Sequence, residues 1–187
     1  ASDVYKRQDL PDASFAGQQE TFLNIDGFDN LIDAVRKVYA SLFTDRAISY
    51  RRLRNFKGSL SISVGVQEMV RSDIGSSGVA FTLDTESGYK GSIFITSSYG
   101  LGEGIVQGTV NPDEFYVFKR ALEKNDFPII KKNMGEKANK MIFADNNLPG
   151  KSVKYVKVPK EEANEFSLTN SEIIELAKYA KTIEDHY

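Results

Sequence analysis

The chain has 187 residues, enough for one domain of ordinary size or for part of a larger one. Lys and Arg total 24 against 26 Asp and Glu, so the net charge of -2 favours neither a nucleic-acid-binding protein nor a membrane-surface protein. The absence of cysteine and the single histidine, His186, exclude disulfide scaffolds, thiolate zinc sites, cysteine nucleophiles and a histidine-based triad within this chain. No apolar run reaches the ~20 residues that span a bilayer, and we expect a cytoplasmic protein with no membrane or nucleic-acid partner.

The N-terminal part begins with residues 1–8, which are polar and aperiodic and are predicted to be unstructured or foreign to the rest. Residues 9–187 are predicted to form the domain proper. A loop rich in small residues leads to a short strand at 22–25. Apolar residues then recur every three or four positions from Phe28 to Phe43, which predicts a helix with Asp26 as its N-cap. A second, shorter helix is expected over 45–54.

The middle of the chain alternates apolar and polar residues, which predicts strands. We expect strands over 61–66 and 79–83 to form a hairpin around the turn at 72–78. Further strands are predicted over 92–98, 114–119, 128–132, 140–144 and 152–158, and Lys137 is expected to be a surface charge.

The last element is a helix, opened by a capping box of Thr169 and Glu172. It continues to the final residue without a stop signal, which suggests that the sequence is cut short. Because the strands are joined by short turns and are not interleaved with helices, the order favours an α+β fold with a mostly antiparallel sheet and flanking helices.

Three segments have residue types suited to a nucleotide. Gly17 in the 16–21 segment can bring backbone N–H groups close to a phosphate. The strand end at 66–70 offers backbone groups, an amide and the flat thioether of Met69 to a purine. Residues 100–104 form a glycine-rich loop with Glu103, but its spacing fits neither a dinucleotide fingerprint nor a P-loop. Each segment taken alone is more readily explained as a turn, a core strand or a flexible loop.

Read together and in order, these segments resemble the phosphoenolpyruvate synthase (pyruvate, water dikinase) family. The resemblance covers residues 9–187 and rests on these motifs: 9–22 (DLPDASFAGQQETF), 41–51 (SLFTDRAISYR), 65–73 (GVQEMVRSD), 77–88 (SGVAFTLDTESG), 99–103 (YGLGE), 107–117 (QGTVNPDEFYV) and 166–170 (FSLTN).

The resemblance implies part of an N-terminal nucleotide-binding domain with an ATP-grasp-like fold, truncated at both ends. It also implies a parent phosphotransferase that needs Mg²⁺. ATP would phosphorylate a histidine on another domain of the same chain, and a further domain would pass the phosphoryl group to pyruvate. The products would be phosphoenolpyruvate, AMP and phosphate. A homodimer of the parent is left open.

The family's ATP-binding residues are carried over by position. The loop with Gly17, Gln18 and Thr21 would lie on the phosphates. The strand end formed by Gln67, Glu68, Met69 and Val70 would hold adenine, and Glu103 is a further candidate near the nucleotide.

Several of the family's functional groups have no counterpart in this chain. The family's phosphate-binding arginine falls where residues 4–8 do not match, so Arg7 is not assigned that role. The metal ligands and the acceptor histidine are expected beyond Tyr187, so no catalytic or metal-binding residue is assigned within the chain. Phosphoryl transfer needs positioned cations, so the fragment alone is predicted to be inactive.

Two alternatives stay open. The chain could be the nucleotide-binding module of a related dikinase or of an antibiotic phosphotransferase, or a non-catalytic ATP-binding module.

Overall fold

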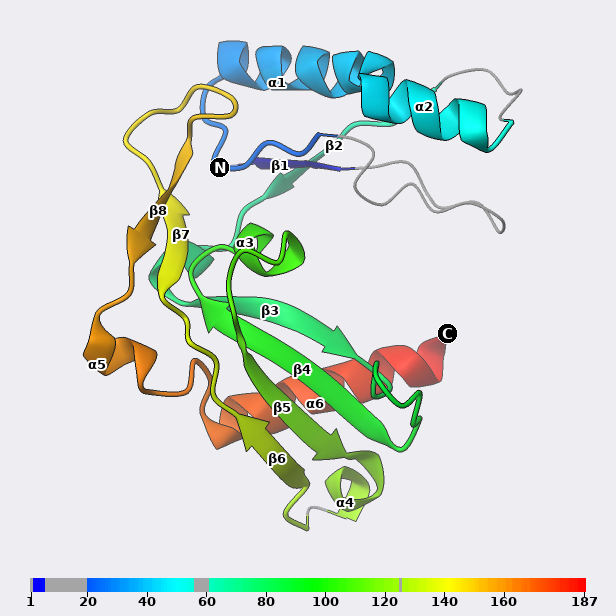
Figure 1. Ribbon diagram of the computed structural model, residues 1–187, viewed down its shortest axis with the longest axis vertical. Coiled ribbons are helices and arrows are strands. Elements are labelled where there is room, and N and C mark those ends of the chain that lie inside the picture. The colour runs from blue at the N-terminus through cyan, green and yellow to red at the C-terminus, as the bar shows by residue number, and fades with distance from the viewer. Residues whose placement is uncertain (1, 6–19, 56–60, 125) are drawn as a thin grey trace. The chain divides into compact units, whose positions relative to one another are not determined.

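The computed structural model describes residues 2–5, 20–55, 61–124 and 126–187, with side chains from residue 20 onward. The chain divides into two compact units. The first unit contains Ala1–Val70 and Phe143–Lys154, and the second contains Arg71–Ile142 and Tyr155–Tyr187. The elements of each unit are labelled in Figure 1.

The first unit holds two helices and a two-stranded sheet. Its elements are β1 (Ser2–Tyr5), α1 (Phe28–Ala40), a 3₁₀ turn (Ser41–Phe43), α2 (Asp45–Leu53) and β2 (Gly65–Glu68). β1 and β2 pair antiparallel, from Ser2 opposite Glu68 to Tyr5 opposite Gly65. The predicted helices are confirmed. Ser2–Tyr5, within the segment predicted to be unstructured or foreign, form strand β1 and pair with β2.

The two helices of this unit begin differently. Thr44 caps α2, and its hydroxyl accepts a hydrogen bond from the Ala47 N–H at 3.3 Å. α1 was predicted to be capped by Asp26, but its N-cap is Gly27, which makes no side-chain bond. A glycine fits there because its φ of 84° lies in the left-handed region, which side-chain-bearing residues avoid.

The second unit is built on a four-stranded antiparallel sheet in the order β3-β4-β5-β6. The strands are β3 (Ser76–Phe81), β4 (Ser92–Tyr99), β5 (Asp113–Phe118) and β6 (Ile129–Asn133). On one face lies the core, whose buried members include Ile93, Phe115 and Ile173. The other face carries a row of rings, with Phe94 lying 6.2 Å from Phe81 and 4.8 Å from Tyr116 between centroids.

Helix α6 (Asn170–His186) covers the core face of this sheet (Figure 1). Its capping box is present as predicted, with Thr169 and Glu172 bonded to each other's backbone N–H groups. The short helix α4 (Lys119–Lys124) follows β5, and Lys119 forms an ion pair with Glu184 of α6 at 2.6 Å. The α+β class with an antiparallel sheet and flanking helices is therefore confirmed.

The remaining elements are α3 (Glu103–Val106), β7 (Asn139–Phe143), β8 (Val153–Lys157) and α5 (Lys160–Ala163). β7 and β8 pair with each other, and the boundary between the two units crosses both strands. Within the described part of the chain, no helix is long and apolar enough to cross a membrane.

One expected pairing is wrong. The strands on either side of the turn at 72–78 do not form a hairpin, since β2 pairs with β1 and β3 pairs with β4. The connection contains a 3₁₀ turn at Ser72–Ile74, and the boundary between the units falls directly after Val70. The two strands therefore belong to separate sheets in separate units.

Candidate functional site

The chain just after the predicted phosphate loop is anchored within the first unit. Gly17 and Gln18 lie outside the described residues, whereas Thr21 is described and half-buried. Three residues on, the Asn24 N–H donates to the Met69 sulfur at 2.9 Å. The Asn24 side-chain amide donates to the Ser152 carbonyl at 2.9 Å, and the Ser152 hydroxyl donates to the Leu23 carbonyl at 2.6 Å. The first bond joins the exit of the loop to the predicted adenine-binding segment, and the other two join it to Ser152.

Asn24 is suited to this junction by its backbone as well as its amide. Its φ of 51° is left-handed, a conformation that asparagine tolerates better than most residues. The residue is 8% exposed, so its polar groups need the partners that they have.

The predicted adenine-binding segment, residues 67–70, is open to solvent along most of its length. Gln67 and Glu68 are exposed in β2, and Val70 is 84% exposed. Pairing with β1 ends at Glu68, so Met69 and Val70 continue beyond the ladder. A strand end of this kind can present backbone N–H and C=O groups to the hydrogen-bonding edge of a purine. Met69 is half-buried, and its sulfur is positioned by the bond from Asn24.

The turn that follows is held by a bidentate ion pair. Arg71 Nε and Nη2 donate to the two oxygens of Asp73 at 2.7 and 2.9 Å. Asp73 is 9% exposed, and the hydrogen bonds from Arg71 lower the pKa of its carboxyl. The pair fixes the conformation of this turn, whose first residue, Arg71, directly follows the predicted adenine-binding segment in the chain.

The glycine-rich segment is held by hydrogen bonds to neighbouring segments. Gly100 has a φ of 85°, and a Cβ there would lie 2.4 Å from the Met141 carbonyl oxygen, so only a glycine fits this close approach. The Gly100 N–H donates to Gly75 and its carbonyl accepts from the Ser77 hydroxyl, while Leu101 donates to Met141. Residues 100–104 do not form a loop throughout, because α3 begins at Glu103.

Glu103 is the first residue of α3, and it lies in the second unit. Its Oε1 accepts a hydrogen bond from the Gln107 amide at 2.7 Å, which orients the carboxylate. The predicted ATP-binding residues therefore divide by unit, with Thr21 and Gln67 to Val70 in the first and Glu103 in the second.

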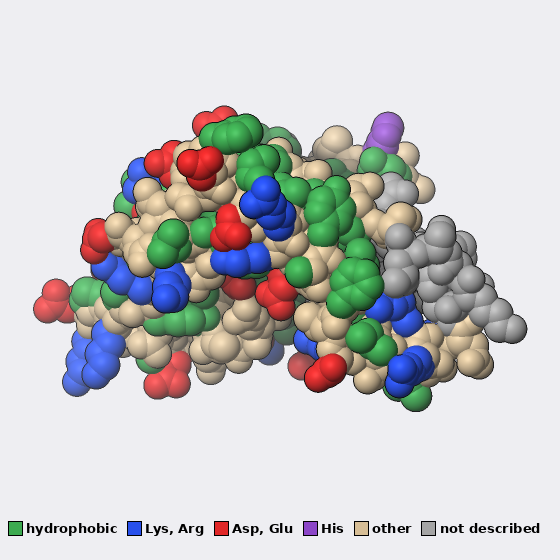
Figure 2. All heavy atoms as spheres, turned by 90° about the horizontal axis from the view of Figure 1, so that it is seen from above, with side chains coloured by type: hydrophobic (Ala, Val, Ile, Leu, Met, Phe, Trp, Pro, Cys, Tyr) green, Lys and Arg blue, Asp and Glu red, His purple; other side chains and the backbone are tan. Residues whose placement is uncertain are grey.

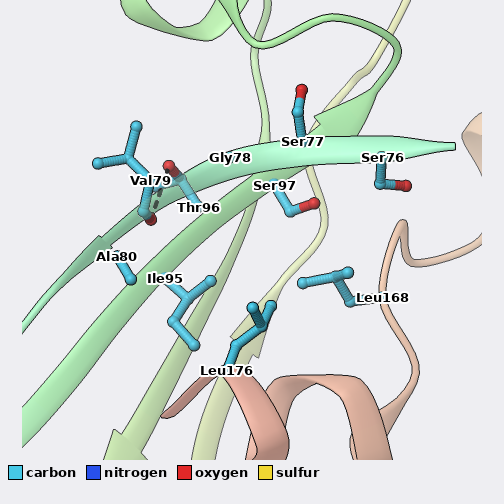
Figure 3. Close-up of a pocket in the computed structure, with 10 residues that line it drawn as sticks. All are labelled: Ser76, Ser77, Gly78, Val79, Ala80, Ile95, Thr96, Ser97, Leu168 and Leu176. Atoms are coloured by element: carbon cyan, nitrogen blue, oxygen red, sulfur yellow. Dashed lines mark hydrogen bonds between the residues drawn. The ribbon is translucent and has the colours of Figure 1, made fainter. Parts of the chain in front are cut away.

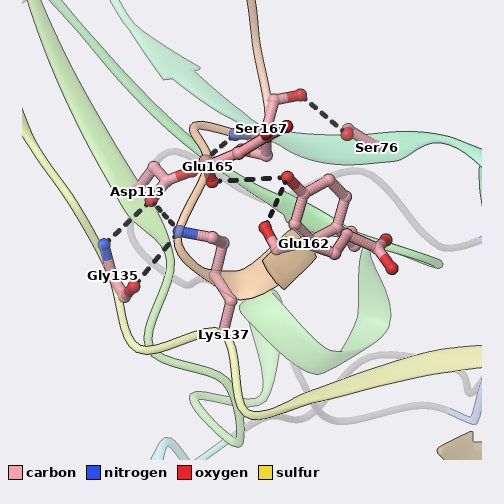
Figure 4. A network of polar contacts seen from close by, with 8 residues as sticks. Ser76, Asp113, Gly135, Lys137, Glu162, Glu165 and Ser167 are labelled. Carbon is pink, nitrogen blue, oxygen red and sulfur yellow. Dashed lines mark hydrogen bonds and ion pairs between the residues drawn. The ribbon is translucent and has the colours of Figure 1, made fainter. Parts of the chain in front are cut away.

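A buried ionic network in the second unit was missed by sequence analysis (Figure 4). Asp113 and Lys137 are both 0% exposed and form an ion pair. The Asp113 carboxylate also accepts from the Gly135 N–H at 2.8 Å and from the N–H and hydroxyl of Ser167 at 2.7 and 2.8 Å. Lys137 is thus not a surface charge. The network ties the start of β5 to the loops before β7 and α6, so its role is to position these segments.

The network continues toward the glycine-rich loop through Tyr99. The Tyr99 hydroxyl donates to the carbonyls of Glu162 and Glu165 at 3.0 and 3.3 Å, and burial raises the pKa of this phenol. Tyr99 directly precedes Gly100, so these bonds fix the entry to the loop. The only sequence signal for these contacts lies in two of the family motifs. The motif at 99–103 contains Tyr99, and the motif at 107–117 contains Asp113.

Two kinds of site are not supported by the described residues. Among them, no group of three or more His, Cys, Asp or Glu side chains could hold a metal ion. On the face drawn in Figure 2, acidic and basic side chains are interspersed, which gives no continuous basic surface there for nucleic acid.

Comparison with known proteins gives one family and several relatives. The family model described as "Pyruvate phosphate dikinase, AMP/ATP-binding domain" matches residues 6–187. Proteins named phosphoenolpyruvate synthase from Neisseria meningitidis, Pseudomonas aeruginosa and Escherichia coli are 62%, 57% and 56% identical to this chain. Each alignment covers 181 residues, 96% of this chain and 23% of the relative. The chain thus spans about a quarter of the length of these relatives.

Proposed function

Because the chain belongs to the pyruvate phosphate dikinase AMP/ATP-binding domain family, we propose that it is the ATP-binding part of a phosphoenolpyruvate synthase. The parent would convert ATP, pyruvate and water to phosphoenolpyruvate, AMP and phosphate through a phosphohistidine on another domain. An ATP-grasp fold is part of this proposal. The cytoplasmic location and the homodimeric parent stay predictions.

One observation carries the assignment of the nucleotide to this chain. The hydrogen bond from Asn24 to Met69 joins the exit of the phosphate loop to the adenine-binding segment within the first unit. A nucleotide needs both regions at once, since its base and its phosphates are covalently linked. The contact supports a site in which Met69 and Val70 hold adenine while Gly17, Gln18 and Thr21 bind the phosphates.

The chain's own residues would bind and orient ATP rather than transform it. Backbone groups of Met69 and Val70 would read the adenine edge, and the Met69 thioether would pack on the ring. Backbone N–H groups near Gly17, with the Gln18 amide and the Thr21 hydroxyl, would donate to phosphate oxygens. Mg²⁺, when bound, neutralises charge on the phosphates, and its ligands are expected outside this chain. In this proposal the fragment alone does not complete phosphoryl transfer.

The test is titration of the full-length parent enzyme with ATP, comparing Met69→Glu with the control Leu53→Glu. Leu53 ends α2 in the same unit and is 83% exposed. A carboxylate in contact with adenine would lose hydration without gaining a partner, so Met69→Glu should raise the Kd for ATP by at least about tenfold. Leu53→Glu, at an exposed position outside the predicted ATP-binding residues, should change it by less than about twofold. Equal effects, or a parent that binds no ATP, would refute the site.

The alternatives differ in the acceptor, which this chain does not contain. The identity of more than half of the residues to three proteins named phosphoenolpyruvate synthase favours that enzyme over a related dikinase. Assays of the parent with pyruvate, with and without inorganic phosphate, separate them. A requirement for phosphate would indicate the related dikinase, and no pyruvate-dependent turnover would favour a different acceptor or a non-catalytic module.

A further inference from the structure

The chain offers a mild oxidant few targets. It contains no cysteine and no tryptophan, and its three methionines are Met69, Met134 and Met141. The second unit has a cavity of about 190 Å³, shown in Figure 3, that is lined by side chains such as Leu168 and Ile95, and none of the described lining residues is a methionine. The susceptibility of this chain to oxidation therefore depends on the surroundings of three thioethers.

Met69 differs from the other two methionines in its exposure and in its contact. Met134 is 47% exposed and Met141 is 5% exposed, whereas Met69 is half-buried and directly precedes Val70, which is 84% exposed. The Met69 sulfur also accepts a hydrogen bond from the Asn24 N–H at 2.9 Å. A small dissolved oxidant can therefore reach Met69, while a backbone donor holds its sulfur in place.

The acceptor that Asn24 finds in this sulfur is a weak one. Asn24 is 8% exposed, so its backbone N–H has little access to water and needs a partner within the protein. A thioether sulfur is only a weak acceptor. Oxidation adds a polar oxygen to the same sulfur, and this oxygen is the stronger acceptor. The N–H that contacts the thioether would therefore stabilise the sulfoxide.

We propose that Met69 is an oxidation site that lowers the affinity of the parent enzyme for ATP. The inference rests on the proposed function, since it concerns the methionine that would pack on adenine. Hydrogen peroxide would transfer one oxygen atom to the Met69 sulfur. A sulfur lone pair forms the S–O bond as the O–O bond breaks, so the sulfur is oxidised and the peroxide is reduced to water. Methionine sulfoxide reductase, with thiols as the source of two electrons, would restore the thioether and release the oxygen as water.

The added oxygen has two places to lie, and each disturbs the contact with adenine. Facing the ring, it puts a polar group where the thioether would present an apolar, polarisable surface. Facing Asn24, it takes over the bond from the N–H, and the sulfur moves away from that donor by one S–O bond length. In the second case the loop exit and the strand end, which meet at Asn24 and Met69, are pushed apart.

The first test maps oxidation in the full-length parent by mass spectrometry of its peptides after brief exposure to hydrogen peroxide. Without ATP, Met69 should gain one oxygen at least about fivefold faster than the buried Met141. Saturating ATP should slow the oxidation of Met69 by at least about threefold and leave the rate at Met134 unchanged, because adenine would cover only the first of these. Oxidation of Met69 that is no faster than that of Met141, or that ATP does not slow, would overturn the proposal.

The second test measures the Kd of the parent for ATP before and after oxidation. Peroxide should raise the Kd by at least about fivefold, and methionine sulfoxide reductase should return it to its starting value. The control Met134→Leu should respond to peroxide as the unaltered parent does. Met69→Leu, whatever its starting Kd, should show no further change. An equal rise in Met69→Leu would place the sensitivity at another residue, and no rise in the unaltered parent would show that the sulfoxide is tolerated, so either result would refute the inference.

The two tests also separate this inference from the proposed ATP site. If oxidation of Met69 leaves the Kd unchanged while Met69→Glu raises it, the ATP site stands and the oxidation site has no effect on binding. If Met69→Glu changes the Kd no more than Leu53→Glu does, the ATP site itself is wrong and the inference fails with it.

Discussion

Strands β2 and β5 each carry one of the family's motifs, yet the side chains of the two strands differ greatly in exposure to solvent. In β5, Asp113, Phe115 and Val117 are all 0% exposed and alternate with half-buried residues. In β2, Val66, Gln67 and Glu68 are exposed, and only Gly65 is half-buried. The β5 motif thus serves the interior of the second unit, whereas the β2 motif presents its side chains to solvent. Two motifs that carry the same family resemblance therefore differ in burial, since one lies in the interior of its unit and the other lies at the surface.

The polar contacts of the two units also differ in burial and in charge. The second unit buries a charged pair, Asp113 and Lys137, with additional donors to the carboxylate. The buried contacts of Asn24 in the first unit are neutral bonds to Met69 and Ser152, while the ion pairs of that unit, Lys37 with Asp33 and Lys154 with Asp145, lie near the surface. Removing one partner of a buried ion pair leaves an uncompensated charge. Removing one partner of a neutral hydrogen bond leaves only an unpaired polar group. The second unit should therefore be the more sensitive to a single substitution.

The largest expected effect tests whether the second unit is the more sensitive of the two to a single substitution. Lys137→Ala leaves the Asp113 carboxylate buried without its counter-charge and should lower the stability of the second unit by about 3–5 kcal/mol. The measurement is hydrogen exchange of the β5 amides, with Lys132→Ala as control, because Lys132 is exposed above the Phe166 ring. If the second unit loses less than about 1 kcal/mol of stability, the Asp113–Lys137 pair contributes no more than a typical surface ion pair.

An intermediate effect is expected in the first unit. Asn24→Ala removes the amide bond to Ser152 and places a less tolerant residue at a φ of 51°. We expect the Kd of the parent for ATP to rise by about tenfold, since the loop exit loses its side-chain bond to Ser152 and the strained backbone no longer holds the residue 24 N–H in place for Met69. Asn30→Ala removes an exposed amide bond to the Asp26 carbonyl and serves as control. Unchanged ATP affinity in Asn24→Ala would separate this junction from the nucleotide site.

Periodic and local features could be predicted from the sequence. The final helix and its capping box follow from apolar spacing and from residues three apart, and β4 and β5 follow from their content of β-branched and aromatic residues. These signals depend on neighbours along the chain, so no tertiary information is needed. The short helices α3, α4 and α5 have four to six residues, too few for a periodic signal.

Contacts between distant residues could not be predicted in the same way. The pairing of β2 with β1 joins residues 60 to 66 positions apart, and the bond from Asn24 to Met69 spans 45. Lys137 looks like any surface lysine until the fold places it beside Asp113, 24 residues earlier. The candidate ATP-binding residues came from ordered motifs rather than from chemistry visible in one segment, and their role stays a prediction.

The smallest expected effect compares the helix starts of the two units. Glu172 in the capping box of α6 accepts bonds from the Thr169 N–H and hydroxyl, and these lower the pKa of its carboxyl. A lowered pKa means that the stabilisation is complete above the unfolded-state pKa and is lost as pH falls through the folded one. α1 has no side-chain cap and should lack this acid sensitivity at its start.

Glu172→Gln keeps an acceptor but removes the charge, so the loss should be below about 1 kcal/mol at neutral pH and should vanish in acid. Hydrogen exchange of the first turn of α6, read at pH 7 and again below the pKa of the carboxyl, measures the difference. Glu123→Gln, an exposed residue of α4, is the control and should show no such pH dependence. A difference that persists unchanged in acid would show that the amide disturbs the geometry of the cap, and that ionisation of Glu172 adds nothing to the start of the helix.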